Sequence, residues 1–192
     1  SLSMREMLMA SKLLSEYMHY AISEKNENIW IAQREGRAKD SNDRTQDAIL
    51  KMMVMGGEGS VAERLAQLHL VPLAISYEYD PCDFLKAQEF QLKRDVPGWK
   101  KSAQDDVVSM QTGIMGFKGR IHYHCAPCID AWLKEIAPDT PKTELFSLIA
   151  THIDKEIHAN YRLYPINFVA LDMLEGGSAH AAEYSADDKA TF

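Results

Sequence analysis

The sequence predicts an α/β fold, in which helices alternate with short strands. Three short apolar segments, residues 28–33, 70–76 and 119–126, have the length and composition of buried strands. The segments around them carry apolar residues at helical spacing, and several begin at helix-start signals. Helices and strands that alternate along a chain indicate the α/β class. At 192 residues and 46% apolar composition, the chain is long enough for one sizeable core.

Helices are expected on both sides of the first candidate strand. The first covers residues 3–25, because Ser3 and Glu6 match a capping box and apolar residues follow at helical spacing. Similar start patterns predict two more helices, over residues 43–55 and 60–68.

The second half of the chain is expected to be largely helical around the third candidate strand. The predicted helices cover residues 80–96, 101–115, 127–136, 140–160 and 169–174. No interior segment is long enough to be a linker between domains. We therefore expect one domain over residues 1–175, followed by a polar tail or the start of an unfinished helix over residues 176–192.

Composition and charge exclude several classes of protein. The net charge of −7 argues against a general nucleic-acid binder, which needs a clustered basic excess. Three cysteines, an odd number, suit a reducing compartment better than a disulfide framework. Neither a signal peptide nor a long uninterrupted apolar run is seen in the sequence, so we expect a soluble or peripheral protein.

A dense group of charged residues follows the first candidate strand. This charged segment, residues 34–40, contains Arg34, Glu35, Gly36, Arg37 and Lys39. A glycine directly after a strand lets the backbone turn sharply and approach a ligand closely. A guanidinium binds phosphate through two parallel hydrogen bonds. The pattern indicates a site for an anionic group; the alternative is a solvated loop with internal ion pairs.

Three sequence blocks occur in an order that resembles the PlsC-like glycerolipid acyltransferases, which form phosphatidate. I-A-Q-R-E-G-R-A-K-D at residues 31–40 resembles their third signature block, a strand followed by E-G-x-R. V-P-L-A-I-S-Y-E at residues 71–78 is similar to the fourth block, and G-R-I-H-Y-H-C-A-P at residues 119–127 to a later strand. The E-G-R of this chain is tighter than the family pattern, because no residue separates Gly36 from Arg37.

The resemblance implies a fold, a reaction and a location. The fold would be a mixed, mostly parallel central sheet flanked by helices, with its N-terminal part missing. The reaction would move a fatty acyl group from acyl-CoA or acyl carrier protein to the hydroxyl of glycerol 3-phosphate, lysophosphatidate or a related lipid. No metal or redox cofactor would be needed. A bacterial origin, a cytoplasmic location and peripheral attachment to the inner face of the membrane also follow from the resemblance.

The resemblance also assigns residues to the acceptor. Carried over to this chain, the third block makes Glu35, Gly36 and Arg37 the acceptor-binding residues, with Arg34 and Lys39 as weaker candidates. Two alternatives remain open. Related enzymes acylate amino-acid lipids, whose acceptor has no phosphate. A non-catalytic lipid- or anion-binding protein could also use E-G-R to hold an anion.

The catalytic base of the family is not found in this sequence. The family uses H-x-x-x-x-D, in which the histidine takes the proton of the acceptor hydroxyl and the aspartate orients it. None of the seven histidines is followed by an aspartate five positions later, and His19 with Glu24 is the nearest match. We therefore expect this chain to lack the catalytic half of the domain, and the catalytic residues stay unknown.

A zinc site is a further hypothesis for the third candidate strand. His122, His124, Cys125 and Cys128 are residue types that bind zinc. However, alternation along a strand directs Cys125 away from the face that carries the two histidines. Ordinary strand residues are the favoured interpretation.

Overall fold

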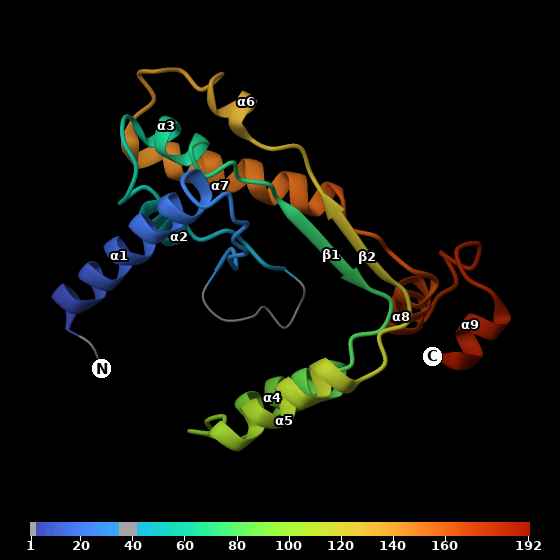
Figure 1. The fold of residues 1–192 in the computed structure, drawn as a ribbon. Helices are drawn as coiled ribbons and strands as arrows, with labels where there is room; N and C mark the ends of the chain where they lie inside the picture. The colour runs from blue at the N-terminus through green and yellow to red at the C-terminus, as the bar shows by residue number, and fades with distance from the viewer. Residues whose placement is uncertain (1–2, 35–41) are drawn as a thin grey trace. The chain divides into compact units, whose positions relative to one another are not determined.

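The computed structural model describes residues 3–34 and 42–192, and these are mostly helical, with 54% in helices and 5% in strands. Figure 1 labels the elements along the chain. The described helices are α1 (Met4–Ser23), α2 (Asp47–Met53), α3 (Val61–Ala66), α4 (Asp83–Asp95), α5 (Ala103–Met115), α6 (Asp130–Leu133), α7 (Lys142–Ala159), α8 (Pro165–Glu175) and α9 (Ala186–Thr191). Among them, none combines the length and the apolar character that crossing a membrane would require.

The expected mixed, mostly parallel central sheet is wrong. The described residues form one antiparallel sheet of two strands, β1 (Leu73–Tyr77) and β2 (Ile121–Cys125). Backbone hydrogen bonds continue beyond the strand ends, from Glu78 N to Arg120 O at 2.9 Å and from Ala126 N to Pro72 O at 2.9 Å. The second and third candidate strands therefore exist, but they pair with each other directly.

The first candidate strand, residues 28–33, is not a strand. Trp30 at its centre is 74% exposed, whereas Ile29 and Ile31 are partly buried against the core. Alternate residues of this segment thus pack inward, although it pairs with no strand in the described part of the chain. A short apolar run has the same sequence signature whether it pairs in a sheet or lies extended over helices.

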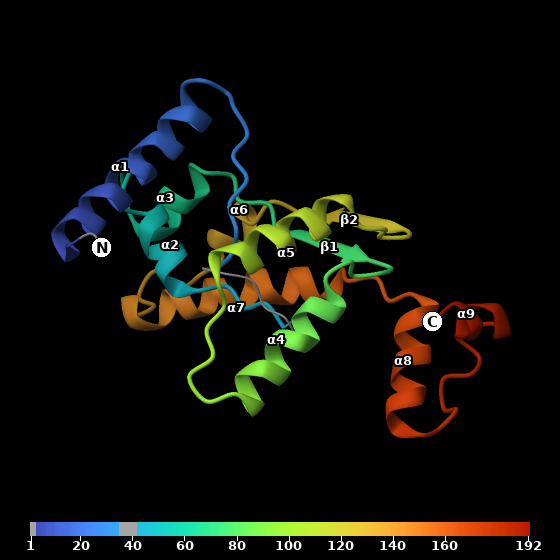
Figure 2. The same cartoon turned by 90° about the horizontal axis from the view of Figure 1, so that it is seen from below.

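The chain divides into two compact units. Unit 1 comprises Ser1–Ala74 and His124–Asn160. In it, α2 lies beside both α1 and α7, and α3 lies beside α6, as Figure 2 shows for α1 and α2. The buried core of this unit consists of Met18, Leu50, Met53, Leu65, Leu68, Ile129, Leu133, Leu145, Phe146, Ile149 and Ala150. The core thus comes from the helices, from Leu68 in the turn after α3 and from Ile129 just before α6.

Unit 2 comprises Ile75–Tyr123 and Tyr161–Phe192. The Cys82 thiol, just before α4, donates to the carbonyl of Ser109 on α5 at 3.3 Å. Helices α8 and α9 lie side by side, and Val169 of α8 is fully buried. These contacts join α5 to the residue before α4, and α8 to α9.

Serine capping boxes begin four of the described helices. Ser3, Ser60, Ser102 and Ser185 each accept a hydrogen bond from the backbone N–H three residues later, as a capping box requires. The predicted starts at Ser3 and Ser60 are confirmed. The predicted start at residue 43 is wrong, because α2 begins at Asp47 without a side-chain cap.

Candidate functional site

Arg34, at the start of the charged segment, lies close to residues 43–46, which follow that segment, in unit 1. Arg34 Nη1 lies 3.7 Å from Asp43 Oδ1, and the backbone N–H of Gln46 donates to the carbonyl of Gln33 at 2.9 Å. We call residues 33–34 and 43–46 the base of the charged segment. The described residues on either side of 35–41 are thus joined to each other.

Helix α7 fixes the base of the charged segment. Thr45 donates its backbone N–H at 2.8 Å and its hydroxyl at 2.7 Å to Asp154 Oδ1. His158 Nε2 lies 3.3 Å from the carbonyl oxygen of Asp43. These contacts use Asp43 and Thr45, which explains why the predicted capping pattern at residue 43 does not start a helix.

Of the predicted acceptor-binding residues, the structure places Arg34 at this base. Its side chain is partly exposed and pairs with Asp43. Glu35, Gly36, Arg37 and Lys39 lie outside the described residues. The acceptor assignment of these four residues stays a prediction.

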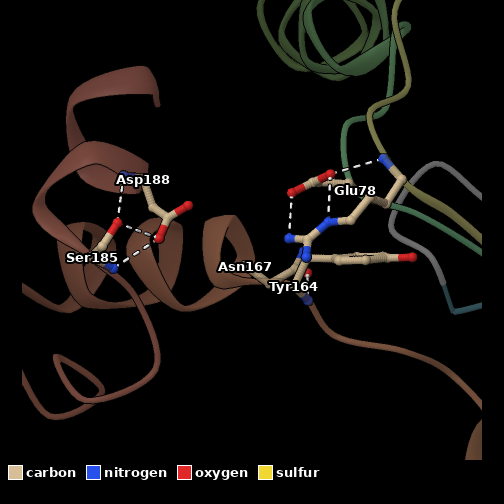
Figure 3. A network of polar contacts seen from close by, with 6 residues as sticks. Glu78, Tyr164, Asn167, Ser185 and Asp188 are labelled. Carbon is tan, nitrogen blue, oxygen red and sulfur yellow. Dashed lines mark hydrogen bonds and ion pairs between the residues drawn. The ribbon is translucent and has the colours of Figure 1, made fainter.

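The other two sequence blocks meet across β1 and β2. In unit 2, Arg120 donates to the Glu78 carboxylate from its backbone N, its Nε and its Nη2, at 2.8, 3.0 and 2.7 Å. The Arg120 guanidinium lies over the Tyr164 ring, 5.0 Å from its centroid. Figure 3 shows this network and, near it, the capping box of Ser185 and Asp188. The side-chain and backbone hydrogen bonds from Arg120 lower the pKa of Glu78. This favours the ionised carboxylate, which accepts the hydrogen bonds from Arg120.

The nearest sequence match to the catalytic motif does not form a histidine–carboxylate pair. His19 is buried on α1, and its Nε2 lies 3.1 Å from the carbonyl oxygen of Met53. Ser15 donates to the same carbonyl at 2.7 Å. Glu24 is the exposed C-cap residue of α1. His19 therefore joins α1 to the end of α2.

Two histidine–carboxylate pairs were missed at the sequence level. His180 Nδ1 lies 2.9 Å from Asp172 Oδ1, and the Tyr184 hydroxyl donates to Asp172 Oδ2 at 2.8 Å. In unit 1, His69 Nδ1 lies 2.6 Å from Asp130 Oδ2. The first pair is eight residues apart in sequence, and the second is 61 residues apart.

Of the residues in the zinc hypothesis, the structure places Cys128 in a group of possible metal ligands. Cys128 lies with His69 and Asp130, and one possible ligand atom from each lies within 4.8 Å of the others. His122, His124 and Cys125 do not belong to this group. Burial, the largest effect, raises the pKa of the Cys128 thiol; the Asp130 carboxylate acts in the same direction, and a hydrogen bond with the Asp130 backbone acts against them. The residues just before β1 pair with the residues just after β2. Knowledge of this pairing would have predicted that His69 lies near Cys128 and Asp130.

The methionines of α1 divide between surface and core. Met4, Met7 and Met9 are exposed, whereas Met18 is buried in the core of unit 1. Of the four methionines of α1, Met18 alone belongs to the buried core of unit 1.

Comparisons with family models, with curated proteins and with solved structures found no match to this chain.

Proposed function

We propose that this chain belongs to an acyltransferase that moves a fatty acyl group from acyl-CoA or acyl carrier protein to a glycerolipid acceptor. The acceptor is glycerol 3-phosphate, a lysophosphatidate or a related hydroxyl lipid. The role of this chain is to bind the acceptor through the charged segment, residues 34–40. The observation that carries the proposal is the fixed base of that segment, where Thr45 is bound to Asp154 and Gln46 to Gln33.

A fixed base matters because binding energy is lost when a ligand must order the protein around it. The contacts of Thr45 with α7 order the flank of the charged segment before any ligand arrives. Arg37 can then bind the phosphate through two parallel hydrogen bonds, with Arg34 and Lys39 adding positive charge. Glu35 can accept a hydrogen bond from an acceptor hydroxyl.

The reaction assigned to the complete site is ester formation. The acceptor oxygen attacks the thioester carbonyl carbon, the carbon–sulfur bond breaks, and the thiol leaves with the proton lost by the hydroxyl. A side chain acting as general base must first accept that proton from the acceptor hydroxyl. The order of the three sequence blocks supports this reaction, and the second and third blocks contain the paired strands β1 and β2. The expected parallel sheet is wrong, so the fold does not support the proposal. The support comes from the sequence blocks and from the fixed residues 33–34 and 43–46 beside the charged segment.

Acceptor binding is tested by calorimetric titration of the full chain with glycerol 3-phosphate, with glycerol as the phosphate-free control. Hydrogen bonds to a charged group contribute about 1.5–3 kcal/mol, so Arg37→Ala should weaken binding by about 10- to 100-fold. Arg94→Ala is the matched control, because Arg94 is an exposed arginine on α4 that pairs with its neighbour Asp95. Equal binding by wild type and Arg37→Ala would remove Arg37 from the site.

Acyl transfer is tested separately, with acyl-CoA and lysophosphatidate and detection of phosphatidate by mass spectrometry. Product detection is preferable to a thiol dye, because the chain has three free cysteines of its own. No histidine stands five positions before an aspartate, so we expect the chain alone to bind the acceptor without turnover. Turnover would assign the base to one of the seven histidines.

Two further outcomes separate the alternatives. Transfer to an amino-acid lipid, without affinity for glycerol 3-phosphate, would assign the phosphate-free acceptor. If the complete gene product binds the phosphorylated acceptor and shows no transfer with either donor, the protein is a lipid- or anion-binding protein. Peripheral contact with the inner face of the membrane belongs to the proposal only in the enzyme case.

A further inference from the structure

Three side chains of unit 1 form a compact group of possible metal ligands. A ring nitrogen of His69, Sγ of Cys128 and a carboxylate oxygen of Asp130 all lie within 4.8 Å of one another. Zinc bonds of about 2.0–2.3 Å in a tetrahedral site put ligand atoms about 3.5 Å apart. Small side-chain rotations would therefore bring the three atoms to bonding distance of one ion.

The backbone beneath the group is fixed. Ile129 N donates to the carbonyl of Leu70 at 3.0 Å, which holds the two chain segments in register next to His69 and Asp130. Ile129, between Cys128 and Asp130, and Leu68, just before His69, are both buried in the core of unit 1. His69 itself adopts a φ of +49°, a left-handed conformation that non-glycine residues adopt uncommonly. The backbone that carries the donor atoms is thus held by a hydrogen bond and by side chains of the core.

One oxygen of the group has no hydrogen-bond partner in the described part of the chain. Asp130 Oδ1 is a buried atom without a donor, while Oδ2 lies 2.6 Å from His69 Nδ1. A buried carboxylate oxygen without a partner is unfavourable. A bound cation would compensate the charge of this carboxylate.

We propose that His69, Cys128 and Asp130 bind a divalent transition-metal ion of the zinc type. One nitrogen, one sulfur and one oxygen ligand match the ligand types of Zn²⁺ and Co²⁺, whereas Mg²⁺ and Ca²⁺ take oxygen ligands. The His69 side chain is 66% exposed, so solvent reaches the group and a water molecule can occupy the fourth position. The ion links the turn before β1 to the turn before α6, and its binding releases the thiol proton.

The test is a titration of the EDTA-treated full chain with Co²⁺, which reports its ligands by absorption. The expected result is one Co²⁺ per chain with a thiolate-to-cobalt band in the near ultraviolet and the visible bands of a tetrahedral ion. Added Zn²⁺ should remove these bands by displacement. A wild-type protein without the thiolate band would overturn the proposal, whatever the behaviour of the variants.

Variants assign the ligands. Cys128→Ser should abolish the thiolate band, and His69→Gln or Asp130→Asn should weaken Co²⁺ binding by at least about tenfold, since loss even of a supporting contact costs about 10- to 100-fold. Cys125→Ser is the matched control, because Cys125 is exposed and lies outside the group. Circular dichroism verifies that each variant is folded. A band that survives Cys128→Ser and disappears in Cys125→Ser would move the ion to β2 and contradict this assignment.

Discussion

Thr45 donates both its backbone N–H and its hydroxyl to one carboxylate oxygen of Asp154, which lies 109 positions later in the chain. Asp154 is only 7% exposed on α7. The contact fixes Thr45, in the base of the charged segment, to α7, the longest described helix of the second half of the chain. The position of Thr45, which follows the charged segment in sequence, therefore depends on long-range hydrogen bonds.

Removing the Asp154 carboxylate should destabilise the protein. Asp154→Ala leaves two donors of Thr45 without their acceptor, and hydrogen bonds to charged groups contribute about 1.5–3 kcal/mol. We expect a loss of about 2–3 kcal/mol in the free energy of unfolding, measured by urea denaturation. Lys155→Ala, at an exposed neighbouring position on α7, should stay within about 0.5 kcal/mol of wild type. Equal stability of the two variants would mean that the Thr45 contact is replaced by water at no cost.

The stacked rings of Trp132 and His152 predict a pH dependence of stability. The ring centroids are 3.8 Å apart and the planes differ by 3°. Burial, the largest effect, lowers the pKa of His152 below 6.5. The folded protein then binds a proton less readily than the unfolded chain, so stability is highest above pH 6.5 and falls as the pH drops toward the lower folded-state pKa.

The measurement is the thermal unfolding midpoint between pH 8 and pH 5. His152→Phe keeps an aromatic ring against Trp132 but cannot be protonated, so its midpoint should fall less on acidification than that of wild type. The same slope in both proteins would remove His152 as a contributor.

Asp172 predicts a second dependence, at lower pH. Burial by itself would raise the pKa of this carboxyl, but hydrogen bonds from His180 and Tyr184 outweigh burial and lower it below 3.8. A lowered folded-state pKa stabilises the protein above pH 3.8, and this contribution is lost as the pH falls through the folded value.

The His180 amide signal reports this loss directly, because its N–H donates to Asp172 at 3.1 Å. Tyr184→Phe removes one donor and should move the midpoint of the signal change to higher pH. Asp187→Asn, at an exposed position on α9, should leave the midpoint unchanged. A shift of equal size in both variants would contradict the role of the Tyr184 hydroxyl.

The helices could be predicted because their signals are local. Ser3 with Glu6 and Ser60 with Glu63 identify helix starts within four residues, and the structure forms both capping boxes. The failed start at residue 43 shows the limit of this rule. Asp43 has the right residue type, but a distant partner on α7 determines the conformation of its neighbour Thr45.

The sheet and the metal-ligand group could not be predicted, because both depend on pairing between distant segments. Nothing local in residues 70–76 distinguishes a parallel partner from the antiparallel strand β2. Once that pairing is known, Leu70 faces Ile129, and the proximity of His69 to Asp130 follows. The sequence contained the ligand residue types but not the register that brings them together.

Gly119, at the start of the third sequence block, should tolerate substitution poorly for two separable reasons. Its φ is +61°, and an added Cβ would lie 2.6 Å from Glu78 Oε2 and 2.7 Å from Tyr79 Cδ2. The left-handed backbone costs a non-glycine residue about 1–2 kcal/mol, and displacing Glu78 disturbs its contacts with Arg120. We expect Gly119→Ala to lower the free energy of unfolding by more than about 2 kcal/mol.

Two other glycines of unit 2 separate the strain from the close contact. Gly98 has a φ of +76° with no atom within 4 Å of an added Cβ, so Gly98→Ala should show the backbone cost alone, about 1–2 kcal/mol. Gly177 has neither a positive φ nor a close neighbour, so Gly177→Ala should be neutral or stabilising by up to about 1 kcal/mol. Urea denaturation of the three variants measures the differences. If Gly119→Ala cost no more than Gly98→Ala, Glu78 could move aside freely, and its bonds to Arg120 would contribute little to the pairing of β1 with β2.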